Sequence, residues 1–367
     1  MTGDLKKAFK NKFPLVSIVV PAYNSEMFIP ALVKNIRDIR YPNYEVIMVF
    51  DPYPDNGVEI ARKMTKDWEN WRVIENKKQI GLSNSLNLGI KKAKGDLIGF
   101  IVTDMAVDKN WLKELVKYLL SADPSVGVVI GKIYDFHHRE RIQVYRMYLM
   151  PQTGYTYIPE YGFKDSKKYQ KPFVGYSGAE GLVFKREVFE RAGLFEKDIT
   201  ILIHDLDMMW RVWLSGYKIV RVPSAKVYHW SLKEGRATAK WEFLYAKMIN
   251  IFIQNYSLKY LLKYLPQLLG VYTFRALVTF LQGNPNPLKG WIMGIGWTIE
   301  NLPRTLRKRR QIQTRVRRVS DDYLHKTIFA NLSLLEFYKY MRWVQKNITP
   351  VMVTEEGKNE KVLTFSN

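Results

Sequence analysis

Residues 15–26, LVSIVVPAYNSE, join a run of β-branched side chains to a proline and a polar loop. A run of this length and composition, closed by Pro21, predicts a buried β-strand. Residues 44–50, YEVIMVF, repeat the pattern. Further apolar runs and helical stretches alternate along the first third, with strands at residues 71–74 and 96–101 and helices at 26–39, 57–69 and 82–93. This alternation predicts an α/β fold with a mostly parallel central sheet flanked by helices.

The middle of the chain is mixed in character. We expect strands at residues 126–134, 179–185 and 217–222 and helices at 186–192 and 205–214. A stretch rich in Tyr, Gly and Lys, residues 145–170, has no regular period and predicts irregular structure.

Composition limits the function classes. The 367 residues are 47% apolar and 25% charged, as in ordinary globular proteins, which argues against a mostly disordered chain. There is no cysteine, so disulfides, thiolate nucleophiles and cysteine-based metal sites are excluded. The formal net charge of +22 leaves open an anionic partner, either nucleic acid, lipid or a phosphate-bearing substrate, or simply a solvated basic surface. The first twelve residues are polar and basic, so residence in the cytoplasm is expected.

The composition changes after about residue 233. Trp241, Leu244, Met248 and Phe252 lie at helical spacing, and the apolar stretch 261–281 is interrupted by charges and a proline. Because a charge at the centre of a bilayer is costly, we expect a helical hairpin lying in a membrane interface. A helical cap over the first domain and a true membrane span remain as alternatives.

Residues 304–318, RTLRKRRQIQTRVRR, lie next to that hairpin and are strongly basic. Such a segment binds anionic lipid headgroups, binds nucleic acid, or is simply a solvated basic helix. The apolar neighbour favours the inner face of the cell membrane and peripheral attachment, with no nucleic-acid partner. We therefore divide the chain into residues 1–235, an α/β domain, 236–320, an amphipathic membrane-associating region with a basic stretch, and 321–367, a C-terminal helix and tail.

Polar side chains follow the predicted strands where a parallel sheet binds its ligands. The loops 21–26 and 51–57 either hold a nucleotide or serve as turns with helix caps. The helix that begins after Gly81 has an N-terminus suited to phosphate. Asp104 follows a buried run and is placed to bind a hard cation by its carboxylate.

A second acidic group lies at residues 204–211, HDLDMMWR. Asp205 is a candidate general base, whereas Asp207 and Arg211 have the spacing of an ordinary ion pair within a helix. His229, after the last predicted strand, is either a metal ligand or a buried histidine without a special role.

The ordered set of these segments resembles the family 2 glycosyltransferases, which have the GT-A fold. The resemblance spans roughly residues 15–230 and rests on PAYNSE, the acidic turn after the second strand, GLSNSLNLGIKKAKGD, the Asp after the fourth strand, SGAEGLVFKREVFERAGLF and HDLDMMWRVWLSGYKI. The C-terminal third is similar to membrane-associated, rhamnosyltransferase-like members that build lipid-linked or surface polysaccharides.

The resemblance implies roles for single residues. Asp205 matches the presumed base of inverting members, and Asp104 with His229 matches the site for Mg²⁺ or Mn²⁺. The implied nucleotide-sugar-binding residues are Pro21, Tyr23, Glu26, Asp51, Gly81, Asn87, Asp104 and Arg211. The chain departs from the family pattern at Phe50, Val102 and His204, where the family usually has acids.

The expected function is therefore that of an inverting glycosyltransferase. It would move a sugar from a nucleotide-diphosphate sugar to a hydroxyl of a lipid-linked or polysaccharide acceptor, with a divalent cation at the diphosphate. The alternative is a catalytically degenerate GT-A protein that binds a nucleotide sugar or a partner transferase. The sugar, the base and the oligomeric state do not follow from the sequence.

Overall fold

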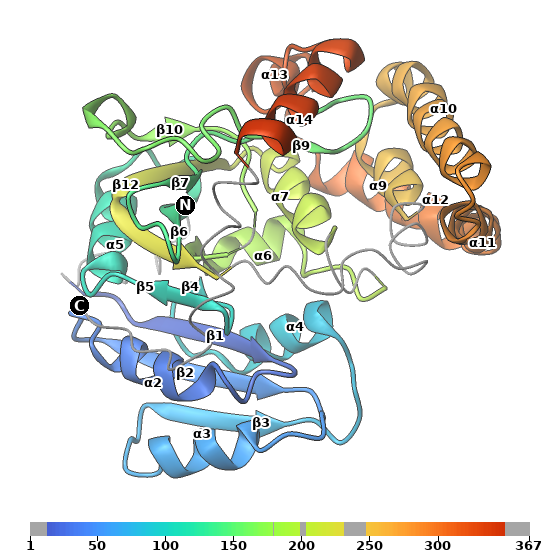
Figure 1. Ribbon diagram of the computed structural model, residues 1–367. Helices are drawn as coiled ribbons and strands as arrows, with labels where there is room; N and C mark the ends of the chain where they lie inside the picture. The colour runs from blue at the N-terminus through green and yellow to red at the C-terminus, as the bar shows by residue number, and fades with distance from the viewer. Residues whose placement is uncertain (1–12, 179, 199–202, 231–246, 349–367) are drawn as a thin grey trace.

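A twisted mixed sheet forms the centre of the molecule (Figure 1). The computed structural model describes residues 13–178, 180–198, 203–230 and 247–348. Within these residues, ten strands form one sheet, whose main path runs β10-β12-β6-β11-β4-β1-β2-β3, with β5 paired to β12 and β7 to β6, while β8 and β9 pair separately. The strands are β1 Val16–Ala22, β2 Tyr44–Phe50, β3 Trp71–Glu75, β4 Leu97–Phe100, β5 Met105–Val107, β6 Val126–Asp135, β7 Ile142–Val144, β8 Tyr148–Leu149, β9 Thr156–Tyr157, β10 Phe173–Val174, β11 Leu182–Lys185 and β12 Lys218–His229.

The first half of the sheet is parallel, as the sequence predicts. Strand β1 lies between β2 and β4 and runs parallel to both, and β3 continues the sheet in the same direction. Strand β11 is antiparallel to its neighbours β4 and β6, whereas β6 and β12 are parallel to each other. The carboxyl ends of β1, β2 and β4 therefore share one edge, and the loops that follow them meet there.

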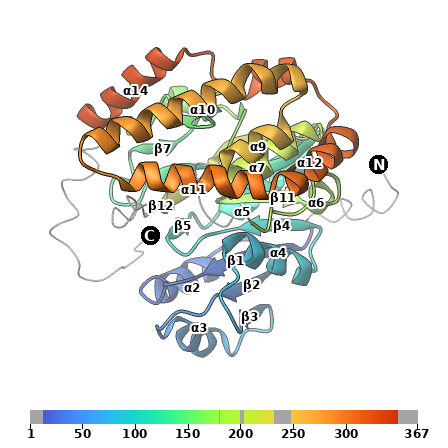
Figure 2. The ribbon, with the colours of Figure 1, turned by 90° about the vertical axis from the view of Figure 1, so that its right-hand side faces the viewer.

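Helices cover both faces of this sheet and form a separate layer at one end. They are α2 Ile29–Arg37, α3 Gly57–Thr65, α4 Leu82–Lys92, α5 Trp111–Ser121, α6 Arg186–Ala192, α7 His204–Leu214, α9 Met248–Asn255, α10 Leu258–Leu281, α11 Asn286–Glu300, α12 Leu302–Gln311, α13 Asp321–Thr327 and α14 Leu334–Asn347, with a 3₁₀ turn η1 Lys167–Tyr169 and a π turn η2 Ile312–Val316. Figure 2 shows α10 and α11 lying side by side along the outside of the molecule. The predicted α/β class with a helical C-terminal region is confirmed.

The long helix α10 packs through one narrow row of side chains. Tyr264, Leu268, Tyr272 and Ala276 recur every fourth residue and are buried. This spacing places them on one helix face, against the body of the molecule. Among the described residues, no helix is both long and apolar enough to cross a membrane.

One hydrophobic core joins the sheet to the C-terminal helices. Trp210 of α7 touches the rings of Phe252 and Tyr256, from α9 and the residue that follows it, and of Phe329 after α13. The same apolar cluster extends from β1 and β4 into α10 and α11. The predicted boundary at 235/236 falls outside the described residues, and packing is continuous between the parts on either side of it.

Several predicted boundaries were wrong. Strand β12 continues to His229, seven residues past its predicted end at 222, because a register shift after Val222 accommodates Pro223 within the strand. Helix α2 begins only at Ile29, after a turn. Trp241 and Leu244 of another predicted helix lie outside the described residues, and the described part of that helix is α9, which contains Met248 and Phe252.

Candidate functional site

Two candidate metal ligands, Asp104 and His229, come together at the edge of the sheet. Asp104 follows β4, and the short strand β5 that comes next pairs with the end of β12, placing Met105 opposite His229. The backbone N–H of Trp230 donates to the Asp104 carbonyl, which fixes the two segments. As a result, His229 Nε2 lies 3.4 Å from Asp104 Oδ2.

The histidine ring is oriented by a residue from a third strand. Its Nδ1 lies 2.8 Å from Oε1 of Gln143 in β7. When Nδ1 donates its hydrogen to that oxygen, Nε2 keeps a lone pair directed toward the Asp104 carboxylate. One oxygen and one nitrogen donor so arranged fit a divalent cation that takes its remaining ligands from substrate and water. Within the described ranges, no group of three or more His, Asp or Glu side chains forms a metal site alone.

Asp205, the predicted base, lies in the first turn of α7. One carboxylate oxygen accepts the N–H of Leu206 at 2.9 Å, which orients the group. Burial raises the pKa of Asp205 to about 6, and the hydrogen bond from Leu206 offsets only part of this effect. A carboxylate with a pKa near neutrality is well matched to accept a proton from a hydroxyl group at physiological pH.

His204 precedes Asp205 and is buried against the Phe195 ring. Burial lowers the pKa of His204 to about 4, so its ring is neutral at pH 7. Its Nδ1 is buried and has no hydrogen-bond partner in the part of the chain that the structure describes. Where the resemblance leads one to expect a charged Glu, this chain therefore presents a neutral ring.

Glu180 connects the two halves of the site, and sequence reasoning assigned it no role. Burial raises the pKa of its carboxyl group, while the charges of Asp104, Asp205, His204 and His229 all act on it. It therefore lies close enough to interact with both the candidate metal ligands and the candidate base. Its signal in the sequence is a lone acid within the small-residue segment SGAEG, directly before β11.

The loops after β1 and β2 form an aromatic platform beside this cluster. The rings of Tyr23 and Tyr53 meet edge to face at 5.0 Å, and both remain exposed. The Glu26 carboxylate accepts the N–H of Asn56, and Asp55 accepts those of Ser25 and Glu26. Pro21 lies within β1 and leads into the first loop. Two loops distant in sequence are thus held as one surface.

Asp51 and Gly81 shape the neighbouring loop. The Asp51 carboxylate is buried and accepts the N–H groups of Ile80 and Gly81 and the amide of Asn76. Gly81 has a φ of +82°, which favours glycine, and α4 begins directly after it. The structure thus uses the Asp51 carboxylate to fix the segment that enters α4.

Two predicted donor-binding residues, Arg211 and Asn87, are buried against the segment between α6 and α7. Arg211 is fully buried, paired with Asp207 at 2.6 Å and hydrogen-bonded to the carbonyls of Ala192 and Leu194. The Asn87 side chain is occupied by both backbone groups of Phe195. The geometry does not support donor contact by either residue, because their polar atoms already hold the segment between α6 and α7.

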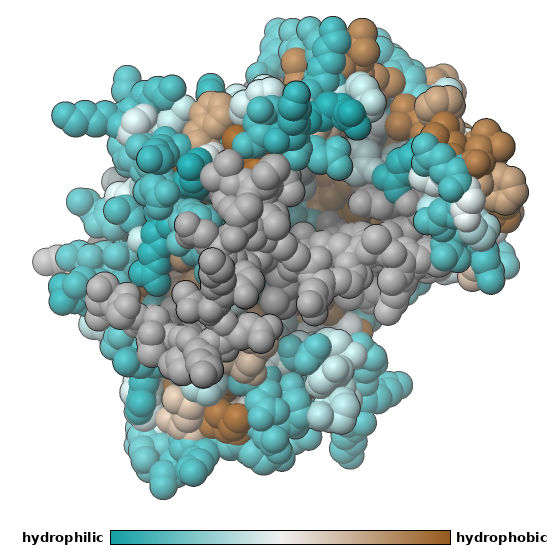
Figure 3. Space-filling view, viewed as in Figure 1, coloured by the Kyte–Doolittle hydropathy of each residue, from teal (hydrophilic) through white to brown (hydrophobic). Residues whose placement is uncertain are grey.

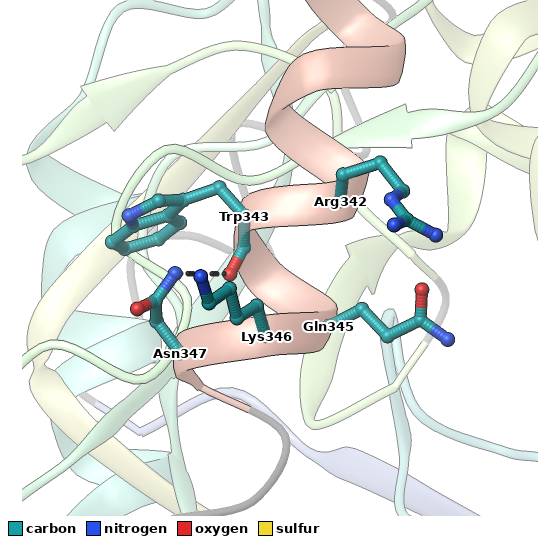
Figure 4. A pocket seen from close by; sticks show the side chains of 5 residues that line it. All are labelled: Arg342, Trp343, Gln345, Lys346 and Asn347. Carbon is teal, nitrogen blue, oxygen red and sulfur yellow. Dashed lines mark hydrogen bonds between the residues drawn. The ribbon is translucent and has the colours of Figure 1, made fainter.

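Two hollows of the described surface differ in their relation to the predicted site, and one, of about 450 Å³, is lined by Ile80, Asn84 and Asn87. The other, of about 550 Å³ at the end of α14, is lined by Arg342, Trp343, Gln345, Lys346 and Asn347 (Figure 4). The Asn347 amide donates to the Trp343 carbonyl of the same helix. This hollow contains none of the predicted site residues, and we assign it no role.

Comparison with known sequences shows which part of the chain resembles a known family. Residues 17–193 match the family model described as Glycosyl transferase family 2. The uncharacterized glycosyltransferase EpsJ of Bacillus subtilis (strain 168) is 32% identical over 190 residues, or 51% of this chain and 52% of EpsJ. The chain thus spans about half the length of that relative.

Solved structures share the fold at low sequence identity. The mannosyltransferase PcManGT from Pyrobaculum calidifontis, in complex with GDP-Man and Mn²⁺, matches with a TM-score of 0.50 at 19% identity, covering 83% of this chain and 86% of that chain. S. aureus TarS 1–349 in complex with UDP-GlcNAc matches with a TM-score of 0.53 at 16% identity, covering 86% and 93%. These likenesses confirm the predicted GT-A fold.

Proposed function

We propose that this chain, whose residues 17–193 match the model of glycosyltransferase family 2, transfers a sugar from a nucleoside-diphosphate sugar to a hydroxyl group with inversion at the anomeric carbon. The observation that carries this proposal is the Asp205 carboxylate, with its pKa raised to about 6, together with the Asp104–His229 pair, since the charges of both groups act on Glu180. A base and a candidate cation site are the two parts that such a transfer requires.

In the proposed reaction, Asp205 accepts the proton of the acceptor hydroxyl. The hydroxyl oxygen then forms a bond to the anomeric carbon, while the bond from that carbon to the diphosphate oxygen breaks. The nucleoside diphosphate leaves with the bonding electrons. Attack from the side opposite the leaving group inverts the anomeric centre.

Asp104 and His229 would hold Mg²⁺ or Mn²⁺ at the diphosphate. Such a cation offsets the negative charge that develops on the leaving group. PcManGT, which shares the fold, is described in complex with Mn²⁺, and this supports the proposal. Asp104 is exposed enough to reach a ligand, and Gln143 holds His229 in place.

The Tyr23–Tyr53 surface is the proposed platform for the donor nucleotide. Its exposed rings offer apolar faces on which a base or ribose can stack. Fold neighbours carry GDP-Man and UDP-GlcNAc, so neither base is favoured by the comparison.

The proposed acceptor is lipid-linked or a polysaccharide, and the proposed place of action is the inner face of the cell membrane. The segment between β7 and η1 would contribute to acceptor binding. Helix α14 supports it: Tyr340 donates to the Ile158 carbonyl, and its ring meets that of Tyr157. The support for a membrane location is the exposed apolar surface of α10 and α11.

Calorimetric titration with UDP-, GDP- and dTDP-sugars, with and without Mn²⁺, tests the proposal. We expect one donor to bind and to need the cation. Asp205→Asn should then lower transfer by 10²–10⁴-fold, because a positioned general base contributes about this much, while the donor Kd stays within about twofold. Full transfer by Asp205→Asn would remove the assigned base.

A non-catalytic binding protein is the second candidate. His204, Val102 and Phe50 stand where the family usually has acids, and the described residues lack a three-ligand metal cluster. This candidate predicts donor binding without turnover at any cation concentration.

A further inference from the structure

One surface of the C-terminal helices is apolar and faces outward. Its exposed apolar side chains are Leu258, Leu262, Phe274, Leu277, Phe280 and Leu281 of α10, Ile292, Met293 and Ile299 of α11, and Leu302 and Leu306 of α12. We call this surface the α10–α12 face. Figure 3 shows the apolar colour concentrated over α10 and α11, and Figure 2 shows the two helices lying along the outside.

The protein's own core does not need these side chains. The opposite face of α10 supplies Leu268 and Tyr272 to the core, and Trp291 of α11 stacks on Tyr272 at 5.4 Å. Phe274, Leu277 and Leu281 lie at the spacing of a second helix face and are 44–81% exposed. Helices that face only water carry polar residues there, so a continuous apolar surface marks a binding surface.

The charge of the same helices is almost entirely positive. Between residues 258 and 311 there are nine Lys or Arg and one acid, Glu300. Four of these cations are held by other parts of the chain, and Arg275 is one of them, since it donates to the Tyr155 hydroxyl. Arg304 pairs with Glu196 and Asp198, and Lys308 with Glu196, so these two anchor the helix to the catalytic domain. Arg309 is occupied by the carbonyls of Ile253 and Tyr256.

Other cations of these helices are exposed. Arg307 and Arg310 are exposed and, within the described residues, have no ion pair or hydrogen bond from their side chains. Arg310 lies four residues after Leu306 and eight after Leu302, so it shares their side of α12. Lys289 is exposed at the start of α11. The apolar surface is thus bordered by cations that are not used within the described chain.

We propose that the α10–α12 face docks on an anionic lipid bilayer, with its apolar side chains in the interface and Arg307 and Arg310 at lipid phosphates. Apolar burial together with several cations is the combination that holds a helix flat on such a surface. Nucleic acid would use the cations and leave the apolar side chains in water. A second copy of this chain would bring the same positive charge against itself. The proposal deepens the proposed function, because it names the surface that would present a lipid-linked acceptor.

Co-sedimentation of the full chain with vesicles tests this proposal. One set of vesicles is phosphatidylcholine alone, and the other contains 30% phosphatidylglycerol, as an experimental choice. Three double variants are compared with the unaltered chain: Phe274→Glu/Leu281→Glu on the apolar side, Arg307→Gln/Arg310→Gln on the basic side, and Lys113→Gln/Lys117→Gln on α5 as a control with the same loss of charge. All six positions are exposed, so the fold should tolerate the changes.

We expect binding to the anionic vesicles that weakens with salt. The arginine variant should bind them about 30-fold more weakly, because each cation near an anionic surface contributes about a fivefold factor in affinity and the variant removes two. The glutamate variant should lose binding to the anionic vesicles, and the α5 control should bind them within about twofold of the unaltered chain.

Three results would overturn the proposal: unaltered vesicle binding by the glutamate variant, equal losses in the α5 control and the arginine variant, or a dimer in light scattering that the glutamate variant converts to a monomer without vesicles. Donor binding by the same variants is measured without lipid. If the unaltered chain does not bind a donor, the result counts against the proposed function alone. If it binds a donor but does not bind vesicles, the result counts against the α10–α12 face alone.

Discussion

At the scale of single residues, the environment of Asp205 predicts a pH dependence. A general base must be deprotonated, and burial raises its pKa to about 6. We therefore expect kcat/KM to fall tenfold per pH unit below about pH 6, two units above the limb of an ordinary Asp near pH 4. The measurement is a pH–rate profile from pH 4.5 to 8 at saturating Mn²⁺. A flat profile down to pH 5 would contradict the assignment of Asp205 as the base.

Gln143 provides a test of the candidate cation site that does not alter its ligands. Its Oε1 holds His229 Nδ1 at 2.8 Å, so Gln143→Leu should free the ring without removing a ligand. Groups that orient a metal-bound histidine typically matter by 10–100-fold. We therefore expect Gln143→Leu to weaken the apparent Mn²⁺ affinity, measured in donor titrations, by 10–100-fold. Gln345→Leu, on an exposed position of α14, is the matched control. Equal Mn²⁺ affinity in both variants would contradict the assignment of His229 as a cation ligand.

Sequence reasoning could identify the site residues that follow strands, but not the partners of buried polar groups. Asp104 and His229 are brought together because both lie at strand ends. Glu180 was missed because its neighbours become apparent only when the segment before β11 is placed beside α7. The spacing of Asp207 and Arg211 predicted their ion pair, whereas the donor role of Arg211 came from the resemblance alone, which says nothing about the two carbonyls that accept hydrogen bonds from its guanidinium.

At the scale of elements, Arg211 tests whether α7 needs its buried ion pair for stability. Arg211→Met would leave the Asp207 charge buried with only a 3.5 Å contact from Asn255. Removing one partner of such a pair typically costs about 3–5 kcal/mol. We expect that loss of stability in urea unfolding, with the donor Kd unchanged where the protein is folded. The double variant Arg211→Met/Asp207→Leu should recover much of the stability. A weaker donor Kd at unchanged stability would restore the donor-binding role.

Periodicity predicted the elements better than their ends. The strands around Val20 and Met48 were predicted because their apolar runs are continuous, as expected for strands buried on both faces. The length of β12 was missed because Pro223 is a local stop signal, whereas the register shift that accommodates it depends on pairing with β6. The orientation of α10 likewise depends on which of its faces packs against the core, and this packing involves residues distant in sequence.

At the scale of the whole molecule, the shared core predicts that residues 1–235 do not fold independently. Without the C-terminal helices, Trp210 would lose its contacts with Phe252, Tyr256 and Phe329. A buried aromatic side chain contributes roughly 3–5 kcal/mol when its packing is removed, a large part of a typical total stability. We therefore expect the fragment 1–235 to bind a hydrophobic dye and to lack near-ultraviolet circular dichroism.

The full chain should instead unfold in one transition, with tryptophan fluorescence and far-ultraviolet circular dichroism changing together, because a continuous core couples the sheet to the helices. The ion pairs of Arg304 with Glu196 and Asp198 make a poor alternative explanation for this coupling, since Arg304 is about half exposed and such pairs contribute little. Arg304→Gln should therefore leave the single transition intact and shift its midpoint only slightly. A fragment 1–235 that folds cooperatively and binds the donor would show that the catalytic domain is independent of these helices and that the core contacts at Trp210 are dispensable.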